Sequence, residues 1–199
     1  MRDYYEDLWE RLPETLTPPD LELRRRFLRE GMRPGDRALD LGCGEGTFTP
    51  ELARAGVASI IGADVAEAAL VRARQRYPDV EFTRVPFDGP LPFPDGAFTL
   101  VWASEVLEHV ADTARFLSEI RRVLAPGGRL LLTTPSHGRL RVLAHGMERF
   151  SEPLGDHLHL YTQRSLRTVL TEFDFASVSL RAAGGPPGLR RILLAQAER

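Results

Sequence analysis

The sequence predicts an α/β protein of the Rossmann-like, doubly wound type with a mostly parallel sheet, and three observations support this. Short apolar runs rich in Val, Ile and Leu alternate with longer segments of helical composition. Three glycines, Gly42, Gly44 and Gly46, follow the first apolar run directly. The length of 199 residues suits one such domain and is short for two. We therefore expect right-handed crossovers and a sheet covered on both faces.

Alternating strands and helices account for the middle of the chain. The predicted parallel strands are Arg37–Leu41, Ala58–Ala63, Val80–Val85, Phe98–Ala103 and Gly128–Thr133. The predicted helices between them, in which Ala, Glu, Arg and Leu recur at helical spacing, are Thr47–Ala55, Ala66–Tyr77 and Asp112–Leu124.

The two ends of the chain follow different patterns. Phe175–Ala183 and Arg190–Ala197 both have strand composition, and the short stretch GGPPGL between them cannot hold a crossover helix. We expect an antiparallel hairpin at the edge of the sheet. At the other end, LTPPD divides residues 1–31 into two helices, and Asp20 is predicted to cap the second.

Composition limits the classes of partner. The net charge of −2 gives no broad basic surface, so neither nucleic acid nor an anionic membrane is the expected partner. The basic run Arg24–Arg26 is interpreted as a solvated helix face. Cys43 is the only cysteine, which excludes an intrachain disulfide and suits a reducing cytoplasm. The first residues lack the apolar core of a signal peptide, and no apolar run reaches the length of a membrane span.

The glycine turn is the strongest indication of a ligand. Ligands of open parallel sheets bind at the carboxyl ends of the strands, which is where this turn lies. Its spacing is G-x-G-x-G, whereas the nicotinamide fingerprint is G-x-G-x-x-G. Asp40 leads into the turn and Glu45 lies within it, and two carboxylates would repel a pyrophosphate but attract a cationic amino or sulfonium group. The charge therefore favours a ligand without phosphate.

Two further acidic residues suggest a nucleoside. Asp64 ends the second predicted strand, where a carboxylate can accept both hydroxyls of a ribose; the alternative role is to cap the next helix. Asp88 follows the third strand and can accept a hydrogen bond from the exocyclic amine of adenine, while Phe87 packs on the ring. The alternative for Asp88 is a turn-forming role in a proline-rich loop.

Five stretches in order, ALDLGCGEGTF, GADVAEAAL, FDGPLPFPDGAF, EVLEHV and RRVLAPGGRLLLTTP, resemble class I S-adenosylmethionine-dependent methyltransferases. The resemblance covers roughly residues 37 to 135. It implies a seven-stranded sheet whose last strand is antiparallel. It also implies methyl transfer from S-adenosylmethionine to an O, N or C atom of a small-molecule acceptor. The residues expected to bind this cofactor are Asp40, Gly42, Cys43, Gly44, Gly46, Asp64, Val65, Phe87, Asp88 and Ser104.

The resemblance also divides the chain, with residues 1–199 forming a single methyltransferase domain. Residues 1–31 would form N-terminal helices and a lid, residues 32–135 the cofactor-binding core, residues 136–162 an acceptor-side lid and residues 163–199 a C-terminal helix and hairpin. A homodimer is an open alternative to the monomer.

The stretch EVLEHV suggests a metal site. Glu105, Glu108 and His109 are spaced i, i+3 and i+4, so they share one face of a helical turn. Carboxylates with an imidazole suit Mg²⁺, Mn²⁺ or Fe²⁺, and GDHLHLYT offers His157 or His159 as a fourth ligand. A similar Glu-x-x-Glu-His set binds metal in the small-RNA 2′-O-methyltransferases. Alternatively, Glu108 and His109 cap the turn and hydrogen-bond to nearby loops.

A general base is needed only where the acceptor must lose a proton, and histidine has a suitable pKa for that role. The candidates are His109 and His137, which are expected near the transferred methyl group.

Two other functions stay open. A nicotinamide oxidoreductase is disfavoured by the glycine spacing, and a non-catalytic module that binds S-adenosylmethionine would keep the same cofactor motifs.

Overall fold

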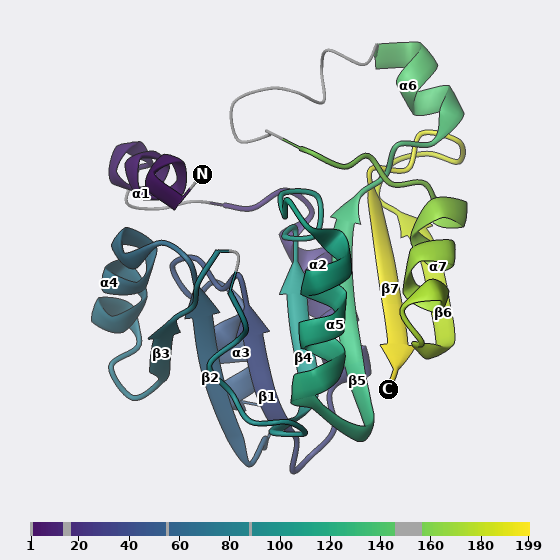
Figure 1. The fold of residues 1–199 in the computed structure, drawn as a ribbon. Helices are drawn as coiled ribbons and strands as arrows, with labels where there is room; N and C mark the ends of the chain where they lie inside the picture. Colours follow the sequence, from purple (N-terminus) through teal and green to yellow (C-terminus); the bar gives the residue numbers. More distant parts are fainter. Residues whose placement is uncertain (1, 14–16, 55, 88, 146–156) are drawn as a thin grey trace.

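One seven-stranded sheet organises the chain (Figure 1). The structure is a computed structural model that describes residues 2–13, 17–54, 56–87, 89–145 and 157–199. The spatial order is β3-β2-β1-β4-β5-β7-β6, and all neighbours pair in parallel except those of β7. The strands are β1 (Arg37–Leu41), β2 (Ser59–Asp64), β3 (Glu81–Arg84), β4 (Phe98–Ser104), β5 (Leu124–Pro135), β6 (Ala176–Ala183) and β7 (Ile192–Glu198).

Helices cover both faces of this sheet, as expected of a parallel sheet built from crossovers. Figure 1 shows α5 in front of the sheet and α2 and α3 behind it, with α1 and α6 beyond the upper strand ends. The helices are α1 (Arg2–Arg11), α2 (Leu21–Gly31), α3 (Thr49–Arg54), α4 (Glu67–Arg76), α5 (Thr113–Val123), α6 (Arg139–His145) and α7 (Gln163–Glu172).

The core divides into two layers because strand residues alternate between faces. On β4, Leu100 and Trp102 are fully buried against α2 and α3, and the Trp102 ring meets Phe48 edge-on at 5.3 Å between centroids. Val101 and Ala103 pack on the opposite face, in the cluster that includes α5 and α7. Every residue of this strand's centre is therefore apolar, which is typical of a strand buried on both sides.

The predicted strands and the edge hairpin are confirmed, with shifts of a few residues at their ends. The two C-terminal strands pair antiparallel, with Ala183 opposite Ile192. The predicted helix start at Asp112 is also correct in position, because its carboxylate accepts a hydrogen bond from the Arg115 backbone N–H at 2.9 Å.

The capping role predicted for Asp20 is wrong. Asp20 precedes α2 but adopts a left-handed backbone conformation, with φ of 52°, and its side chain makes no capping hydrogen bond. A capping side chain needs an extended backbone at this position. The carboxylate instead forms an ion pair with Arg191, which precedes β7.

The order of the strands reverses between β1 and β4, and this is where a doubly wound sheet binds its ligands. The carboxyl ends of both strands point to the side of the sheet on which α1 lies (Figure 1). No helix in the described part of the chain has both the length and the apolar composition that crossing a bilayer requires.

Candidate active site

A pocket of about 600 Å³ lies at the carboxyl ends of the parallel strands. Its described walls include Leu41 at the end of β1 and Gly42 after it, Asp64 at the end of β2, Val85 after β3 and Glu105 after β4. This volume is typical of a small-molecule site. The reversal of strand order therefore produces one pocket that all four strand ends reach.

The glycine turn forms one wall with its backbone. Gly42 has a φ of 75°, and a Cβ there would overlap the Cγ2 atom of Val106. Gly44 has a φ of 52°, and a Cβ there would lie 2.8 Å from the ring of Trp9. Both positions require glycine for conformation and for space. The backbone N–H of Gly42 donates to the Ala63 carbonyl at 2.7 Å, which fixes the turn against β2.

Asp64 links this turn to the start of α4. One carboxylate oxygen accepts a hydrogen bond from the Gly44 N–H at 2.8 Å, and the other accepts from the Ala66 N–H at 3.0 Å. Burial raises the pKa of Asp64, against the lowering effect of these hydrogen bonds. The side chain also lines the pocket, so it holds the helix start and faces a ligand at once.

The other two acids near the turn do not face the pocket as the charge argument assumed. Glu45 is buried, and its carboxylate is paired with Arg76 at 2.6 Å, so its charge is already balanced. Asp40 lies beneath the turn and accepts a hydrogen bond from the Thr49 hydroxyl at 2.7 Å. Burial raises the pKa of Asp40 to about 7. Of the three acids Asp40, Glu45 and Asp64, Asp64 is thus the one found among the described residues that line the pocket.

The predicted cofactor residues divide into two groups. Those that line the pocket are Gly42, Gly44, Asp64, Val65 and Phe87. Those that do not line it are Asp40, Cys43, Gly46 and Ser104. Asp88 lies outside the described residues. Phe87 packs beside Tyr5 of α1, with ring centroids 6.0 Å apart. Cys43 is buried, and burial raises the pKa of its thiol, so this side chain is a small neutral group packed beneath the turn.

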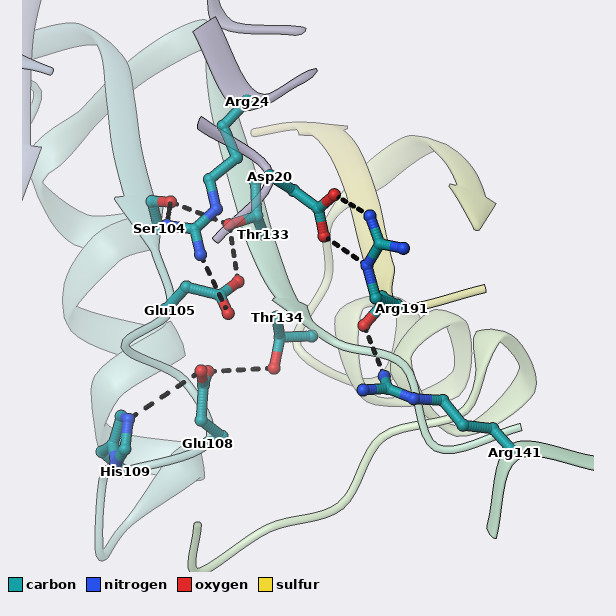
Figure 2. A network of polar contacts seen from close by, with 10 residues as sticks. All are labelled: Asp20, Arg24, Ser104, Glu105, Glu108, His109, Thr133, Thr134, Arg141 and Arg191. Carbon is teal, nitrogen blue, oxygen red and sulfur yellow. Dashed lines mark hydrogen bonds and ion pairs between the residues drawn. The ribbon is translucent and has the colours of Figure 1, made fainter. Parts of the chain in front are cut away.

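The stretch EVLEHV is a turn and not a helical face, which corrects the predicted geometry. Glu105 has a φ of 58°, so its side chain leaves the face that it was expected to share with Glu108 and His109. Its carboxylate pairs with Arg24 at 3.3 Å and accepts a hydrogen bond from the Thr133 hydroxyl at 2.9 Å (Figure 2). Glu105 therefore does not join the predicted metal ligands.

Glu108, His109 and His157 do come together. One possible ligand atom from each lies within 4.8 Å of the others. Glu108 is fully buried, and its Oε2 atom accepts a hydrogen bond from the Thr134 hydroxyl at 2.9 Å. Its Oε1 atom has no hydrogen-bond partner among the described residues and lies 3.9 Å from Nε2 of His109 (Figure 2). Burial, and then the charge of Glu105, raise the pKa of Glu108.

The two predicted catalytic histidines differ in position. His109 lines the pocket, and its ring meets that of His157 at 5.0 Å between centroids. His137 is buried and is not among the described residues that line the pocket. Burial lowers its pKa, which opposes a charged state. The structure thus brings His109 to the pocket but not His137.

Arginines contribute to the pocket in a way that the sequence alone did not reveal. Arg24 was expected on a solvated face, but its side chain is 5% exposed and points from α2 to Glu105 and Ser104. Arg191 and Arg141 also line the pocket, and Arg141 donates to the Arg191 carbonyl (Figure 2). A run of charged residues on a helix does not indicate which side chain points inward, so the inward position of Arg24 is seen only in the structure.

Known proteins match this chain in sequence and in fold. Residues 39–132 match the family described as "Methyltransferase domain". A 27-O-demethylrifamycin SV methyltransferase from Amycolatopsis mediterranei is 40% identical over 51% of this chain and 39% of its own length. A demethylmenaquinone methyltransferase from Beutenbergia cavernae is 41% identical over 51% of this chain and 42% of its own length. The chain thus matches only about two fifths of the length of these curated relatives.

The fold comparison covers more of the chain. The crystal structure of an S-adenosylmethionine-dependent methyltransferase from Mesorhizobium loti superposes with a TM-score of 0.71 at 24% identity. This match covers 86% of this chain and 95% of the other. The likeness in fold therefore extends well beyond the stretch that matches the family, which ends within β5.

Proposed function

Because this chain contains a class I S-adenosylmethionine-dependent methyltransferase domain, we propose that it transfers a methyl group from S-adenosylmethionine to an O, N or C atom of a small-molecule acceptor. One observation carries the proposal. The glycine turn and Asp64 share a single pocket with the turn that holds Glu105 and His109. A cofactor on the first wall would present its methyl group to an acceptor on the second.

For methyl transfer, the main task of the protein is to position the acceptor atom and the methyl donor. Methyl transfer from a sulfonium is an in-line displacement in which the acceptor atom forms a bond to carbon as the bond to sulfur breaks. Holding both reactants in line can lower the barrier by ~7–11 kcal/mol. Gly42 and Gly44 offer backbone at close range to the methionine end, and Asp64 offers a carboxylate to the ribose hydroxyls. His109, beside the acceptor, can accept a proton from a hydroxyl acceptor.

A small molecule is the acceptor that this pocket supports best. Its walls combine apolar residues such as Leu91, Val110 and Phe116 with a smaller number of polar and charged side chains. The relatives that share the matched stretch are named for a demethylrifamycin and a demethylmenaquinone. Since one stretch serves different acceptors, it supports the cofactor and leaves the acceptor to be found by assay. We place the activity in the cytoplasm, because the single cysteine of this sequence excludes an intrachain disulfide and suits a reducing compartment.

The test is transfer of a labelled methyl group from S-adenosylmethionine to a panel of phenols, quinols, amines and carboxylic acids. The proposal expects labelled product with at least one class, and loss of that product in the Gly42→Ala variant. Tight cofactor binding with no transfer to any acceptor would favour the non-catalytic module. Absence of both binding and transfer would contradict the proposal.

A second candidate, metal-assisted O-methyl transfer, is favoured by the cluster of Glu108, His109 and His157. A buried carboxylate oxygen that has no hydrogen-bond partner among the described residues, next to two imidazoles, fits a divalent cation such as Mn²⁺, Fe²⁺ or Zn²⁺. When bound, the cation would polarise the oxygen of a hydroxyl acceptor. Glu105 is not needed in this set, because Arg24 and Thr133 hold its carboxylate.

Metal titration separates the two candidates. Stoichiometric binding of Mn²⁺ or Zn²⁺ to the chelator-treated protein, monitored by calorimetry, is expected only for the metal-assisted enzyme. Glu108→Gln should then weaken binding, whereas Glu105→Gln, the matched control, should keep it. Equal loss in both variants would return Glu105 to the ligand set, and no binding at all would leave methyl transfer without a metal.

A further inference from the structure

The first helix roofs the pocket without being buried itself. Tyr5, Leu8, Trp9 and Leu12 recur at helical spacing, and all four line the pocket. None of the described side chains of α1 is buried. Figure 1 shows α1 above α4, on the side of the sheet to which the carboxyl ends of the parallel strands point. The apolar face of α1 therefore lies over a cavity and gains little from contact with the core.

Glu6 fixes the middle of this helix to the start of α4. The residue before α4 is Ala66, which has no side chain that could cap the helix. The Glu6 carboxylate accepts hydrogen bonds from the backbone N–H groups of Glu67 at 2.9 Å and Ala68 at 3.0 Å. It also pairs with Arg84. Glu6 thus supplies from another helix the cap that α4 lacks.

Arg72 makes the reciprocal connection. Its guanidinium donates to the backbone carbonyls of Trp9 at 2.6 Å, Leu12 at 2.9 Å and Pro13 at 3.0 Å. Carbonyls at a helix end have no partner within the helix, so Arg72 caps the C-terminal end of α1 from α4. The same guanidinium lies 5.8 Å from the centre of the Trp9 ring. Each helix therefore caps the other.

We propose that Glu6 and Arg72 are positioning residues that latch α1 over the cofactor end of the pocket and hold Trp9 as a wall of the cofactor site. The Trp9 ring faces Gly44, at the turn where the methionine end of the cofactor is proposed to lie. An isolated helix of this length is unstable in water, so its position depends on such anchors. The inference rests on the proposed function, since it assigns the roof to S-adenosylmethionine.

The test uses Glu6→Ala and Arg72→Met, with Glu10→Ala and Arg11→Met as controls on the exposed side of α1. The readouts are the Kd for S-adenosylhomocysteine, the fluorescence of Trp9 and the hydrogen exchange of α1 amides. A Trp9→Phe variant assigns the fluorescence, because the other tryptophan, Trp102, is fully buried in the core.

In the latch variants we expect the Kd to rise about tenfold, which corresponds to the loss of one helix cap. Trp9 emission should shift to the red, and α1 amides should exchange faster, while the melting temperature falls by no more than the ~2–4 °C that the loss of one cap accounts for. A larger fall in melting temperature, together with faster exchange throughout the sheet, would indicate general destabilisation and overturn the latch.

Failure of the latch and failure of the proposed function give different results. Wild-type affinity and unchanged α1 exchange in both latch variants would overturn the latch and leave methyl transfer intact. If α1 loosens but the Kd is unchanged, Trp9 is not a wall of the cofactor site and the proposal is wrong. No binding of S-adenosylhomocysteine by the wild type would contradict the proposed function, and with it the assignment of the roof.

Discussion

The carboxylate of Asp64 accepts a hydrogen bond of 2.8 Å from the backbone N–H of Gly44. This contact joins the end of β2 to the glycine turn after β1, so the two elements expected to hold the ribose and the methionine end form one unit. The same carboxylate is bonded to the start of α4. A ligand that binds Asp64 therefore contacts a side chain that is held both by the glycine turn and by the start of α4.

Replacement of Asp64 by Asn should weaken both cofactor binding and the local fold. The neutral amide is a weaker acceptor for the ribose hydroxyls than the carboxylate, so affinity for S-adenosylhomocysteine should fall about 10- to 100-fold. Both carboxylate oxygens accept backbone N–H groups, so the amide NH2 would face one of these donors, and the melting temperature should fall although burial raises the pKa of Asp64. Asp112→Asn, which keeps its capping role outside the pocket, should change neither quantity.

Gly42→Ala should damage the turn sterically. Its φ of 75° costs any other residue ~1–2 kcal/mol, and the new Cβ would also overlap Val106. Gly35 has a similar φ of 80°, but a Cβ there would meet no atom within 4 Å, so Gly35→Ala carries the conformational cost alone. Urea unfolding and cofactor titration of both variants isolate the overlap. Equal effects on cofactor affinity would contradict close approach at Gly42.

Stability should depend on pH through Asp40. Its folded pKa of about 7 lies above the ordinary value of 3.8, so the folded state holds a proton that the unfolded chain has lost. The stability that this proton confers is complete below about pH 4 and is lost as the pH rises through 7. Asp40→Asn should therefore gain stability over the wild type between pH 5 and pH 8, by at most ~4 kcal/mol. A constant difference across this range, measured by urea unfolding, would contradict the raised pKa.

The pair of Arg24 and Glu105 should behave as a coupled unit. Arg24→Met leaves a mostly buried carboxylate without its cation and should cost ~2–3 kcal/mol in urea unfolding. The double variant Arg24→Met/Glu105→Gln should recover most of that loss, because no charge then stays uncompensated. Simple addition of the two single effects would show that the ion pair is not formed.

The sheet was predictable because its signals are local. The continuous apolar run Leu100 to Ala103, the short GGPPGL connection and the glycine turn each constrain the backbone by their own sequence. Positions that depend on a left-handed backbone were not predictable. Asp20 and Glu105 are not glycines, so nothing in their sequence announced the conformations that turn their side chains toward arginines.

The parts of the site that a backbone motif defines could be predicted from the sequence. The contacts between charged residues that are far apart in the sequence could not. Gly42, Gly44 and Asp64 follow directly from strand ends. The pairing of Glu45 with Arg76, the inward turn of Arg24 and the reciprocal caps of Glu6 and Arg72 join residues far apart in the chain. Such contacts exist only once the helices are placed on the sheet.

The central claim is that this pocket holds S-adenosylmethionine and not a dinucleotide. Calorimetric titration with S-adenosylhomocysteine, with NAD as the parallel ligand, tests it most directly. We predict micromolar binding of S-adenosylhomocysteine, lost in Gly42→Ala, and no measurable binding of NAD. Preference for NAD, or no binding of either ligand, would contradict the account.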